Sequence, residues 1–140
     1  SLYKDRIFNI HTSFLPWNRG AHPNFWSWFD DTPKGVTIHH MDRGIDTGDI
    51  VAQKQVIFQR PEEETLATSY EQLHDSAIGL LKHMWPVLIK GAADRTQQSV
   101  ILGSGHTKKD FERWEKKLPN GWDTSVEWVE KQGREYRYGK

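Results

Sequence analysis

Short apolar runs separated by turn-forming residues predict three β-strands in the first 60 positions of this chain. Each run is rich in β-branched or aromatic residues, and most are bounded by Gly, Pro, Asp or Asn. The expected strands are residues 6–10, 36–41 and 50–58. The expected loops are residues 12–20, 30–35 and 42–48. Pro23 can start a helix that continues over residues 24–29, because proline is favoured in a first helical turn.

The pattern changes at Thr65, where apolar positions begin to recur every three or four residues. Thr65 is expected to cap the N-terminus of a long helix, Pro86 to kink or end its last turn, and Gly91 to stop it. The apolar positions of this helix are Leu66, Tyr70, Leu73, Ala77, Leu80 or Leu81, Met84 and Leu88. We interpret this stripe as a core-facing surface.

The pattern is weaker in the last third of the chain. Residues 109–117 are expected to form a short helix. Thr124 is expected to cap another short helix that runs through Val129, and residues 132–140 are expected to fray.

The element order predicts an α/β fold with three strands, one long helix and an irregular C-terminal tail. We divide it into a core over residues 1–92 and a C-terminal extension over residues 93–140. Three strands leave at least one long sheet edge unpaired. We therefore expect either self-association or an N-terminal half that is missing from this chain.

Composition narrows the classes of function. The 140 residues suit one domain, and seven Trp and six Phe argue against disorder. The 19 basic and 19 acidic residues balance, so no nucleic-acid partner is expected. The absence of cysteine excludes a disulfide framework and a thiol nucleophile. No apolar run approaches the roughly 20 residues of a membrane span, and no signal peptide is visible, so we expect a cytoplasmic location.

Candidate chemistry begins with Asn9 and His11, at the end of the first predicted strand. Residues two apart on a strand point the same way, so both side chains would face one crevice. A second cluster, HHMDRGIDTGDI, places Asp46 in the loop after the next strand. If the two strands are neighbours, an amide, an imidazole and a carboxylate meet. This trio suits acyl-type transfer to an amine, in which a proton leaves the amine and an oxyanion is stabilised.

The stretches FNIHTSFLPWNRGAHPNFW and GVTIHHMDRGIDTGDIVAQKQV resemble the catalytic core of the folate-dependent formyltransferases. The matching residues are Asn9, His11, Ser13 and Asp46. The resemblance implies the C-terminal half of a Rossmann-like mixed sheet and N10-formyltetrahydrofolate as the formyl donor. It implies catalytic roles for Asn9, His11 and Asp46. The implied folate-binding loop comprises Met41, Asp42, Gly44 and Ile45. The candidate residues for binding the other substrate are Ser13, His22 and His39.

The finer resemblance is to the sugar N-formyltransferases, which implies a small-molecule amine on a nucleotide-linked amino sugar as acceptor. Methionyl-tRNA formyltransferases are the alternative. Trp17, Trp26 and Trp28 are candidates for lining an acceptor pocket, although none can be assigned. The family's first half would precede Asn9, so this chain by itself is expected to bind folate poorly and to be inactive.

Two other interpretations stay open. His11, His39 or His40, and Asp46 can be imagined as a metal site, although no local spacing supports it and no metal is expected. The chain can also be a non-catalytic remnant that serves as an assembly module, with its open sheet edge used for dimerisation. Ser13 and His22 have structural interpretations as well, as a loop hydrogen-bonding residue and a packed histidine.

Overall fold

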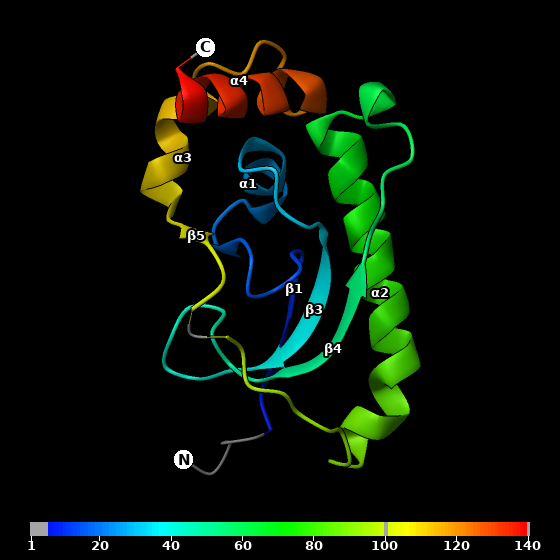
Figure 1. Cartoon of the computed structure of the whole chain (residues 1–140). Coiled ribbons are helices and arrows are strands. Elements are labelled where there is room, and N and C mark those ends of the chain that lie inside the picture. Colours follow the sequence, from blue (N-terminus) through cyan, green and yellow to red (C-terminus); the bar gives the residue numbers. More distant parts are fainter. Residues whose placement is uncertain (1–5, 100, 140) are drawn as a thin grey trace.

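The computed structural model describes residues 6–99 and 101–139. Its centre is an antiparallel sheet with the strand order β1-β3-β4, which Figure 1 shows running alongside a long helix. The strands are β1 (Phe8–His11), β3 (Gly35–His40) and β4 (Ile50–Gln55). All three lie where the apolar runs predict them.

The strand boundaries differ from the prediction at two places. β1 starts at Phe8 and includes His11, so the predicted span of residues 6–10 is shifted towards the C-terminus. β4 ends at Gln55, three residues before the predicted end. Beyond it, Phe58 leaves the sheet and packs against the ring of Trp28, with the ring centroids 5.1 Å apart. Packing of Phe58 in the helical layer therefore outweighs its preference for a strand.

The long helix α2 (Leu66–Ile89) begins and ends at the predicted signals. Thr65 caps it and forms a reciprocal capping box with Thr68. At the C-terminus Gly91 has φ 64° and its N–H donates to the Leu88 carbonyl, the geometry of a glycine stop. Pro86 does not end the helix, which continues to Ile89. Proline in the last turn removes a single backbone donor, so the remaining bonds suffice to carry the helix past it.

One face of the sheet is covered by α2. Leu73 and Ala77 of the helix form a buried cluster with Val36 of β3, and Ile10 of β1 packs against it. Side chains alternate along each strand, so the neighbours of these residues point away from α2. Asn9, His11, Thr37 and His39 consequently lie on the face that α2 does not cover.

A second, purely helical layer surrounds α1 (Pro23–Phe29). Figure 1 shows α1 enclosed by α3 (Lys108–Glu115), α4 (Val126–Tyr138) and the first turns of α2. Two 3-10 turns, η1 (Pro61–Glu63) and η2 (Gly121–Asp123), complete the connections. All residues of α1 after Pro23 are buried, because a helix that is apolar on every side needs partners on every side. Trp26 and Trp28 are therefore core residues of α1.

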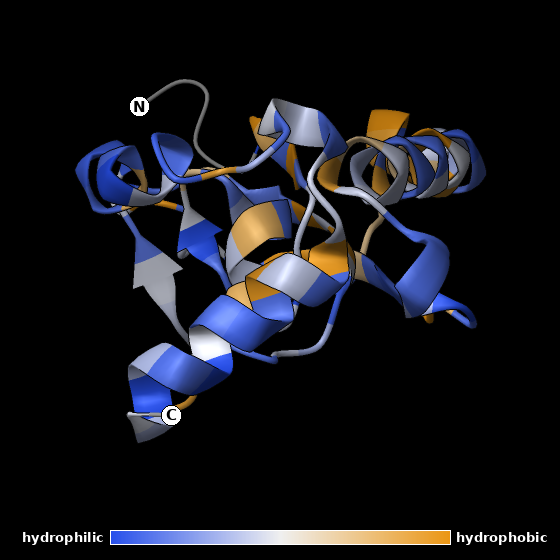
Figure 2. Ribbon diagram, turned by 90° about the horizontal axis from the view of Figure 1, so that it is seen from above, coloured by the Kyte–Doolittle hydropathy of each residue, from blue (hydrophilic) through white to orange (hydrophobic). Residues whose placement is uncertain are grey.

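The prediction of an irregular tail is wrong for the described residues. α4 is capped by Ser125 instead of Thr124 and continues to Tyr138, past the predicted end at Val129. Figure 2 shows that its hydrophobic positions lie in its first half, so the sequence of its second half looks like a frayed end. That half is held by packing and by Arg137, which donates to the Phe29 carbonyl. Lys140 lies outside the described residues.

A small second sheet joins the N-terminal part of the chain to the C-terminal extension. β2 (Arg19–Gly20) lies in the loop predicted for residues 12–20, and it pairs parallel with β5 (Gly105–His106). Two residues are too few to give a hydrophobic period, so the pairing has no sequence signal. It brings the C-terminal extension against the segment that follows His11.

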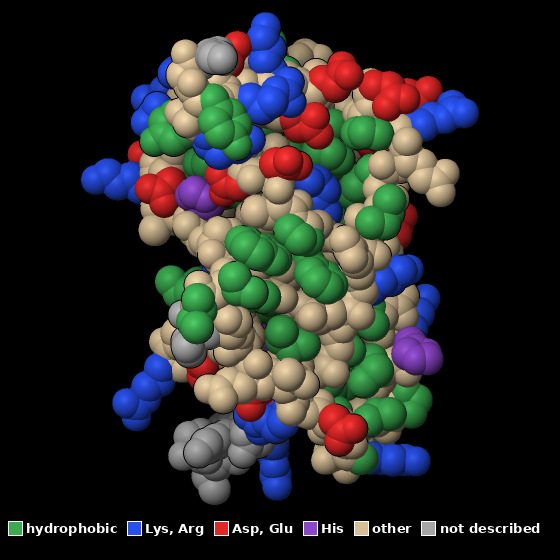
Figure 3. Space-filling model, in the orientation of Figure 1, with side chains coloured by type: hydrophobic (Ala, Val, Ile, Leu, Met, Phe, Trp, Pro, Cys, Tyr) green, Lys and Arg blue, Asp and Glu red, His purple; other side chains and the backbone are tan. Residues whose placement is uncertain are grey.

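Exposed surface remains on α2 and β1. Within residues 6–99 and 101–139 no strand pairs with the outer edge of β1, while Ile50 at the β4 edge forms an antiparallel bridge with Thr96. Figure 3 shows hydrophobic side chains over the lower half of α2, where Trp85 and Ile89 are exposed. None of the helices in the described part of the chain is long and apolar enough to cross a membrane.

Substitutions at two helical glycines test how closely α4 packs against the end of α1. A Cβ added at Gly133 would overlap the Phe29 carbonyl oxygen, whereas one at Gly79 on α2 meets nothing within 4 Å. We expect Gly133→Ala to lower the free energy of unfolding by about 1–3 kcal/mol through overpacking. Gly79→Ala should raise it by about 0.5–1 kcal/mol because alanine favours the helix. Urea denaturation measures both, and equal shifts for the two variants would contradict the close packing of α4.

Candidate active site

The first side chains of the candidate site lie on β1 and β3. Asn9 and His11 project from the same face of β1. The register pairs Asn9 with His39 and His11 with Thr37, and directly opposed residues of an antiparallel pair share a face. Asn9 Nδ2 lies 3.3 Å from His39 Nε2. The alternation therefore turns His39 towards the site and His40 towards the opposite face.

Asp46 joins these residues from the loop that follows β3. Its Oδ1 lies 3.4 Å from Asn9 Nδ2 and 3.4 Å from His39 Nε2. Its Oδ2 lies 3.5 Å from His11 Nε2 and accepts a hydrogen bond of 2.8 Å from the Gly20 N–H. The three residues that the sequence selects, Asn9, His11 and Asp46, are thus brought together, with His39 as a fourth member.

The predicted route by which they meet is wrong. The two motifs were expected at the carboxyl ends of neighbouring strands, but β1 and β3 are antiparallel, so His11 lies beside Thr37 near the start of β3. The side chains meet because the loop after β3 returns across the sheet face. Asp46 has φ 56°, a left-handed conformation that Asp tolerates better than most residues. The resemblance of the two sequence motifs to a family does not reveal that the loop after β3 folds back across the sheet.

His11 is poised as a neutral imidazole. Its Nε2 lies 2.8 Å from the Asn18 carbonyl oxygen, and because a carbonyl only accepts, Nε2 carries the hydrogen and Nδ1 holds the lone pair. Burial lowers the pKa of His11 below its ordinary value, and the nearby Asn18 carbonyl and Asp46 carboxylate oppose that effect without reversing it. The ring can therefore accept a proton at Nδ1 near neutral pH.

The pKa of His39 is shifted in the opposite direction, upwards. Its side chain is 1% exposed, and Nδ1 donates to the His40 carbonyl, 2.9 Å away. Burial lowers its pKa, but the hydrogen bonds to Asp46 and to that carbonyl more than compensate, so the net shift is upward. His39 lies beneath Asp46 and reaches solvent hardly at all. The structure thus places His39 in contact with Asp46, and its contact with a substrate stays a prediction.

The carboxyl of Asp46 is held in its ionised form. Burial, the largest single effect, raises its pKa, but the His39 hydrogen bond, the charge of His11 and the Gly20 N–H together lower it. The net pKa lies below the ordinary value for aspartate. When His39 is protonated, it forms a partly buried ion pair with Asp46, next to His11, whose lowered pKa favours its neutral form.

Gln98 fixes the loop that carries Asp46, and sequence reasoning missed it. Its Nε2 donates to the carbonyls of Asp46 and Gly48, at 2.8 and 2.7 Å. Its Oε1 accepts from Arg19 Nε and Nη2, at 3.1 and 2.8 Å. Arg19 belongs to β2, beside the Gly20 N–H that binds Asp46. Gln98 is buried, but a single glutamine in a polar segment gives no periodic signal.

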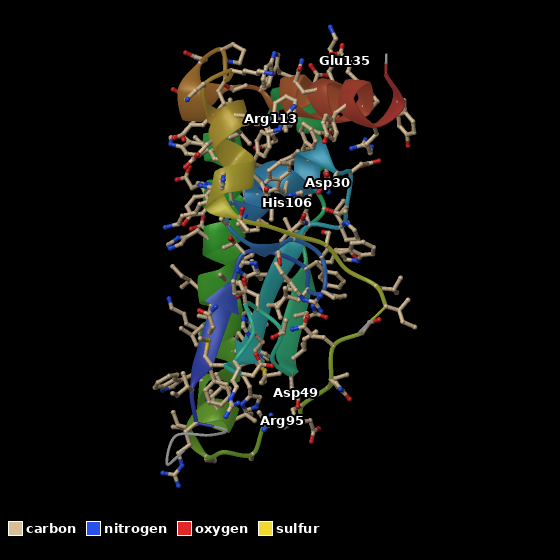
Figure 4. The ribbon with its side chains drawn as sticks, turned by 90° about the vertical axis from the view of Figure 1, so that its left-hand side faces the viewer. Asp30, Asp49, Arg95, His106, Arg113 and Glu135 are labelled. Atoms are coloured by element: carbon tan, nitrogen blue, oxygen red, sulfur yellow. The ribbon has the colours of Figure 1, made fainter. Side chains whose placement is uncertain are left out.

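A hydrogen bond and an ion pair hold the C-terminal extension at both ends of this region. His106 Nε2 lies 2.8 Å from Asp30 Oδ2, and Arg95 Nε lies 2.8 Å from Asp49 Oδ2. Figure 4 shows the first pair beside α1 and the second near the far end of the sheet. Asp49 is thus an ion-pairing residue at the start of β4. The extension predicted for residues 93–140 contributes directly to the surroundings of Asp46.

The predicted folate loop is exposed beside Asp46. Met41 and Ile45 are apolar and exposed, Ile45 by 71%. Asp42 Oδ1 accepts from the Gly44 N–H and from the Thr47 hydroxyl, at 2.9 and 2.7 Å, so Asp42 shapes the turn. A Cβ at Gly44 would overlap the Thr47 side chain. A glycine at this position leaves room for the Thr47 side chain, in addition to its predicted place in the folate-binding loop.

The two remaining predicted binding residues, Ser13 and His22, lie apart from this cluster. Ser13 is 1% exposed, and its hydroxyl has no hydrogen-bond partner among the described residues. His22 precedes α1 with φ 51° and stacks on Phe111, with ring centroids 4.1 Å apart. Burial lowers the pKa of His22.

The described residues form two pockets large enough for a small molecule, and one of them is lined by Asp46 of this cluster. One, of about 580 Å³, is lined by Ile45 and Asp46 and by polar and charged groups of β2 and the start of α3, including Arg19 and Lys108. The other, of about 520 Å³, is lined by His22, Trp122 and the first turns of α1 and α2. In the described part of the chain, no three or more His, Asp or Glu side chains are grouped so that they can hold a metal ion.

Residues 1–83 match the family model described as "Formyl transferase". The chain is 37% identical over 97 residues to methionyl-tRNA formyltransferase of Syntrophus aciditrophicus, covering 69% of this chain and 30% of that protein. It is 31% identical over 108 residues to dTDP-4-amino-4,6-dideoxyglucose formyltransferase of Mycobacterium tuberculosis, covering 77% of this chain and 45% of that protein. The chain thus spans less than half the length of these curated relatives.

A solved structure is similar over almost the whole chain. It is the formyltransferase PseJ from Anoxybacillus kamchatkensis, in complex with UDP-4,6-dideoxy-4-formamido-L-AltNAc and tetrahydrofolate. The TM-score is 0.88 at 42% identity, and the match covers 94% of this chain and 68% of that one. The fold likeness therefore includes the helices that follow the region matched by the family model.

Loss of the Gln98 side chain should loosen Asp46. In Gln98→Ala the carbonyls of Asp46 and Gly48 lose their donor, so we expect faster hydrogen exchange at the Gly20 amide, which donates to Asp46 Oδ2. NMR-detected exchange measures it. Gln97→Ala, at the exposed neighbouring position, should leave that rate unchanged. Equal acceleration by both variants would show that Gln98 does not fix the loop.

The two histidines should titrate in a defined order. The pKa of His39 should exceed that of His11, and Asp46→Asn should lower the His39 pKa by removing its charged partner. Histidine-selective NMR titration tests this order.

The same pKa shifts make stability depend on pH. Since folding raises the His39 pKa, its proton stabilises the fold fully below pH 6.5, and this contribution is lost as pH rises through the folded-state pKa. The lowered Asp46 pKa stabilises the fold above pH 3.8, and that contribution is lost as pH falls through its folded-state value. Identical stability profiles for wild type and Asp46→Asn would contradict the ion pair.

Proposed function

The chain belongs to the formyl transferase family, and we propose that its cluster of Asn9, His11 and Asp46 takes part in transferring a formyl group from N10-formyltetrahydrofolate to an amine. The observation that carries this proposal is the convergence of an amide, a neutral imidazole and an ionised carboxylate on one sheet face. These groups match what direct transfer between two bound substrates requires. None is a covalent nucleophile of the usual kind.

The proposed reaction forms one C–N bond and breaks another. The amine nitrogen attacks the formyl carbon, and the carbonyl oxygen takes negative charge. The bond from that carbon to N10 of the folate then breaks. The amine loses a proton and N10 gains one, so the two proton transfers balance and no oxidant or reductant is needed.

His11 is proposed as the group that handles the proton. Its lone pair lies on Nδ1, because Nε2–H is engaged by the Asn18 carbonyl. Accepting a proton turns the ring into an imidazolium, and the Asp46 carboxylate, 3.5 Å from Nε2, stabilises that charge. Asn9 has two N–H groups, and we propose that the one not directed at Asp46 stabilises the oxyanion.

The donor is proposed to lie against the loop Met41–Ile45. This loop presents exposed apolar side chains directly before Asp46, and the pocket of about 580 Å³ opens beside Ile45 and Asp46. An exposed apolar loop next to an ionised carboxylate suits a flat, partly apolar heterocycle. Of the loop's residues, Asp42 and Gly44 act through the turn that they form with Thr47.

The acceptor is proposed to be the amino group of a nucleotide-linked amino sugar. PseJ, whose structure contains such a nucleotide sugar, matches 94% of this chain, including α3 and α4. The methionyl-tRNA formyltransferase of Syntrophus aciditrophicus matches 69%. The higher identity to PseJ, 42% over almost the whole chain against 37% over 97 residues, supports the sugar over tRNA.

A further polypeptide is proposed to cover the outer edge of β1. That edge and the lower half of α2 are open in the described residues, and exposed edges invite pairing. Either another segment of a longer protein or a second copy of the chain can fill it. Assembly without catalysis is the alternative function, and the following experiment separates the two.

Formyl transfer from N10-formyltetrahydrofolate to a panel of nucleotide-linked amino sugars tests the proposal. We expect His11→Ala to lower kcat by about 10²–10⁴-fold, the range for loss of a general base, and Asp46→Asn to lower it as well. His83→Ala removes an exposed histidine on α2 and should leave the rate unchanged. Retained activity in His11→Ala, with the fold intact by circular dichroism, would remove His11 from the mechanism.

A further inference from the structure

The proton transfer proposed for His11 needs an imidazole ring that stays in one orientation. We propose that Asn18 is a positioning residue for this reaction, because its backbone carbonyl holds the His11 ring with the hydrogen on Nε2 and the lone pair on Nδ1. The inference rests on the proposed function, since it explains how the chain prepares one of the proposed groups. Asn18 lines neither of the two pockets, so it acts through His11 and not by touching a substrate.

The contact between Asn18 and His11 is short and buried. The carbonyl oxygen of Asn18 lies 2.8 Å from His11 Nε2, and the two residues are 1% and 9% exposed. A buried ring that turned over would lose this hydrogen bond without gaining one to water, which is costly. Asp46 Oδ2 lies farther from the same nitrogen, at 3.5 Å. Asn18 therefore accepts the hydrogen bond, and Asp46 contributes its charge.

The peptide unit that carries this carbonyl is held at its other end. Its N–H belongs to Arg19 and donates to the Ser104 carbonyl, 2.9 Å away. The preceding N–H, that of Asn18 itself, donates to the Ser104 hydroxyl, also at 2.9 Å. Ser104 of the C-terminal extension thus binds the N–H groups on both sides of Asn18. The carbonyl cannot tilt away from His11 without straining these bonds.

The Asn18 side chain fixes the same turn from the helical layer. Asn18 has φ 59°, a left-handed conformation that asparagine tolerates better than most residues. Its Nδ2 donates to Thr32 Oγ1 at 2.8 Å. The Thr32 N–H in turn donates to the Ser27 carbonyl of α1, at 3.0 Å. Residue type and hydrogen bonding therefore support the same direction of the Asn18 carbonyl.

The arrangement remains suitable after His11 takes up a proton. The new hydrogen adds to Nδ1, while Nε2–H stays directed at the Asn18 carbonyl. An acceptor that is already in place needs no reorientation when charge develops on the ring. The Asn18 carbonyl also opposes the lowering of the His11 pKa by burial. One hydrogen bond therefore orients the neutral ring and stabilises the charged one.

NMR of protein that contains isotope-labelled histidine tests the orientation without any activity. In the wild type, the His11 resonances, assigned by their loss in His11→Ala, should show a single tautomer with a slowly exchanging hydrogen on Nε2. Thr32→Val removes the acceptor of the Asn18 side chain. It should speed this exchange by about 2- to 13-fold, the range for one neutral hydrogen bond.

Two further variants control for the substitution itself. Thr32→Ser keeps the hydroxyl and should restore the wild-type exchange rate. Thr96→Val changes an exposed threonine and should leave the rate unchanged. Thermal unfolding of each variant shows that the fold is intact.

Kinetics with the same variants separate positioning from binding. Thr32→Val should lower kcat for formyl transfer by about 10- to 100-fold, because a small misplacement of a reacting group is that costly. KM for both substrates should stay the same, since Thr32 and Asn18 line neither pocket. Asn18→Gly accepts the same φ but lacks the side chain. It removes the same hydrogen bond as Thr32→Val, so the double variant should be no slower than either single one.

Three results would overturn the inference. They are two populated tautomers of His11 in the wild type, unchanged Nε2–H exchange in Thr32→Val, and loss of the single tautomer in Asp46→Asn, which would assign the orientation to Asp46 instead of Asn18. The proposed function fails separately. A single, protected tautomer in a protein that transfers no formyl group would keep the orientation of His11 by Asn18 and refute the transferase activity.

Discussion

An ionised carboxylate that is partly buried needs hydrogen-bond donors or positive charges close to its oxygens. Asp46 has such contacts with four residues. Asn9 and His39 approach one oxygen, and His11 and the Gly20 N–H approach the other. Each contact is modest, and several are long for hydrogen bonds. The contacts with His39, His11 and the Gly20 N–H together lower a pKa that burial raises. The site consequently depends on a charge balance that no single strand provides.

The helical layer makes that balance possible by holding the segment that follows His11. α1 is so completely enclosed that it works as the core of a small helical cap. The loop between β1 and α1 is tied to this cap by His22, and to the C-terminal extension by the pairing of β2 with β5. Gly20, which contacts Asp46, belongs to β2 and lies two residues before His22. The β2–β5 pairing and the packing of His22 therefore fix the position of the Gly20 N–H.

The sequence predicts some parts of the site and the fold and not others, and the reasons are physical. Asn9 and His11 are predictable because the strand period of two places them on one face. His39 is predictable only as one of two alternatives, since the register that turns it inward depends on β1. Gln98 has no local signal at all, because the backbone carbonyls that it binds lie 52 and 50 residues away. The second half of α4 was misjudged because a hydrophilic helix resembles a frayed end when its contact with Phe29 is unknown.

The hydrogen bond from Gln98 to the Asp46 carbonyl spans 52 positions along the chain. During synthesis, β1, β3 and the loop after β3 leave the ribosome well before Gln98 does. Closing so distant a contact comes late in folding, because long-range contacts carry the larger entropy cost. The sheet can therefore form while its carboxylate is still unaligned. The geometry around Asp46 is in this way tied to completion of the C-terminal extension, and a half-made chain has these residues without their arrangement.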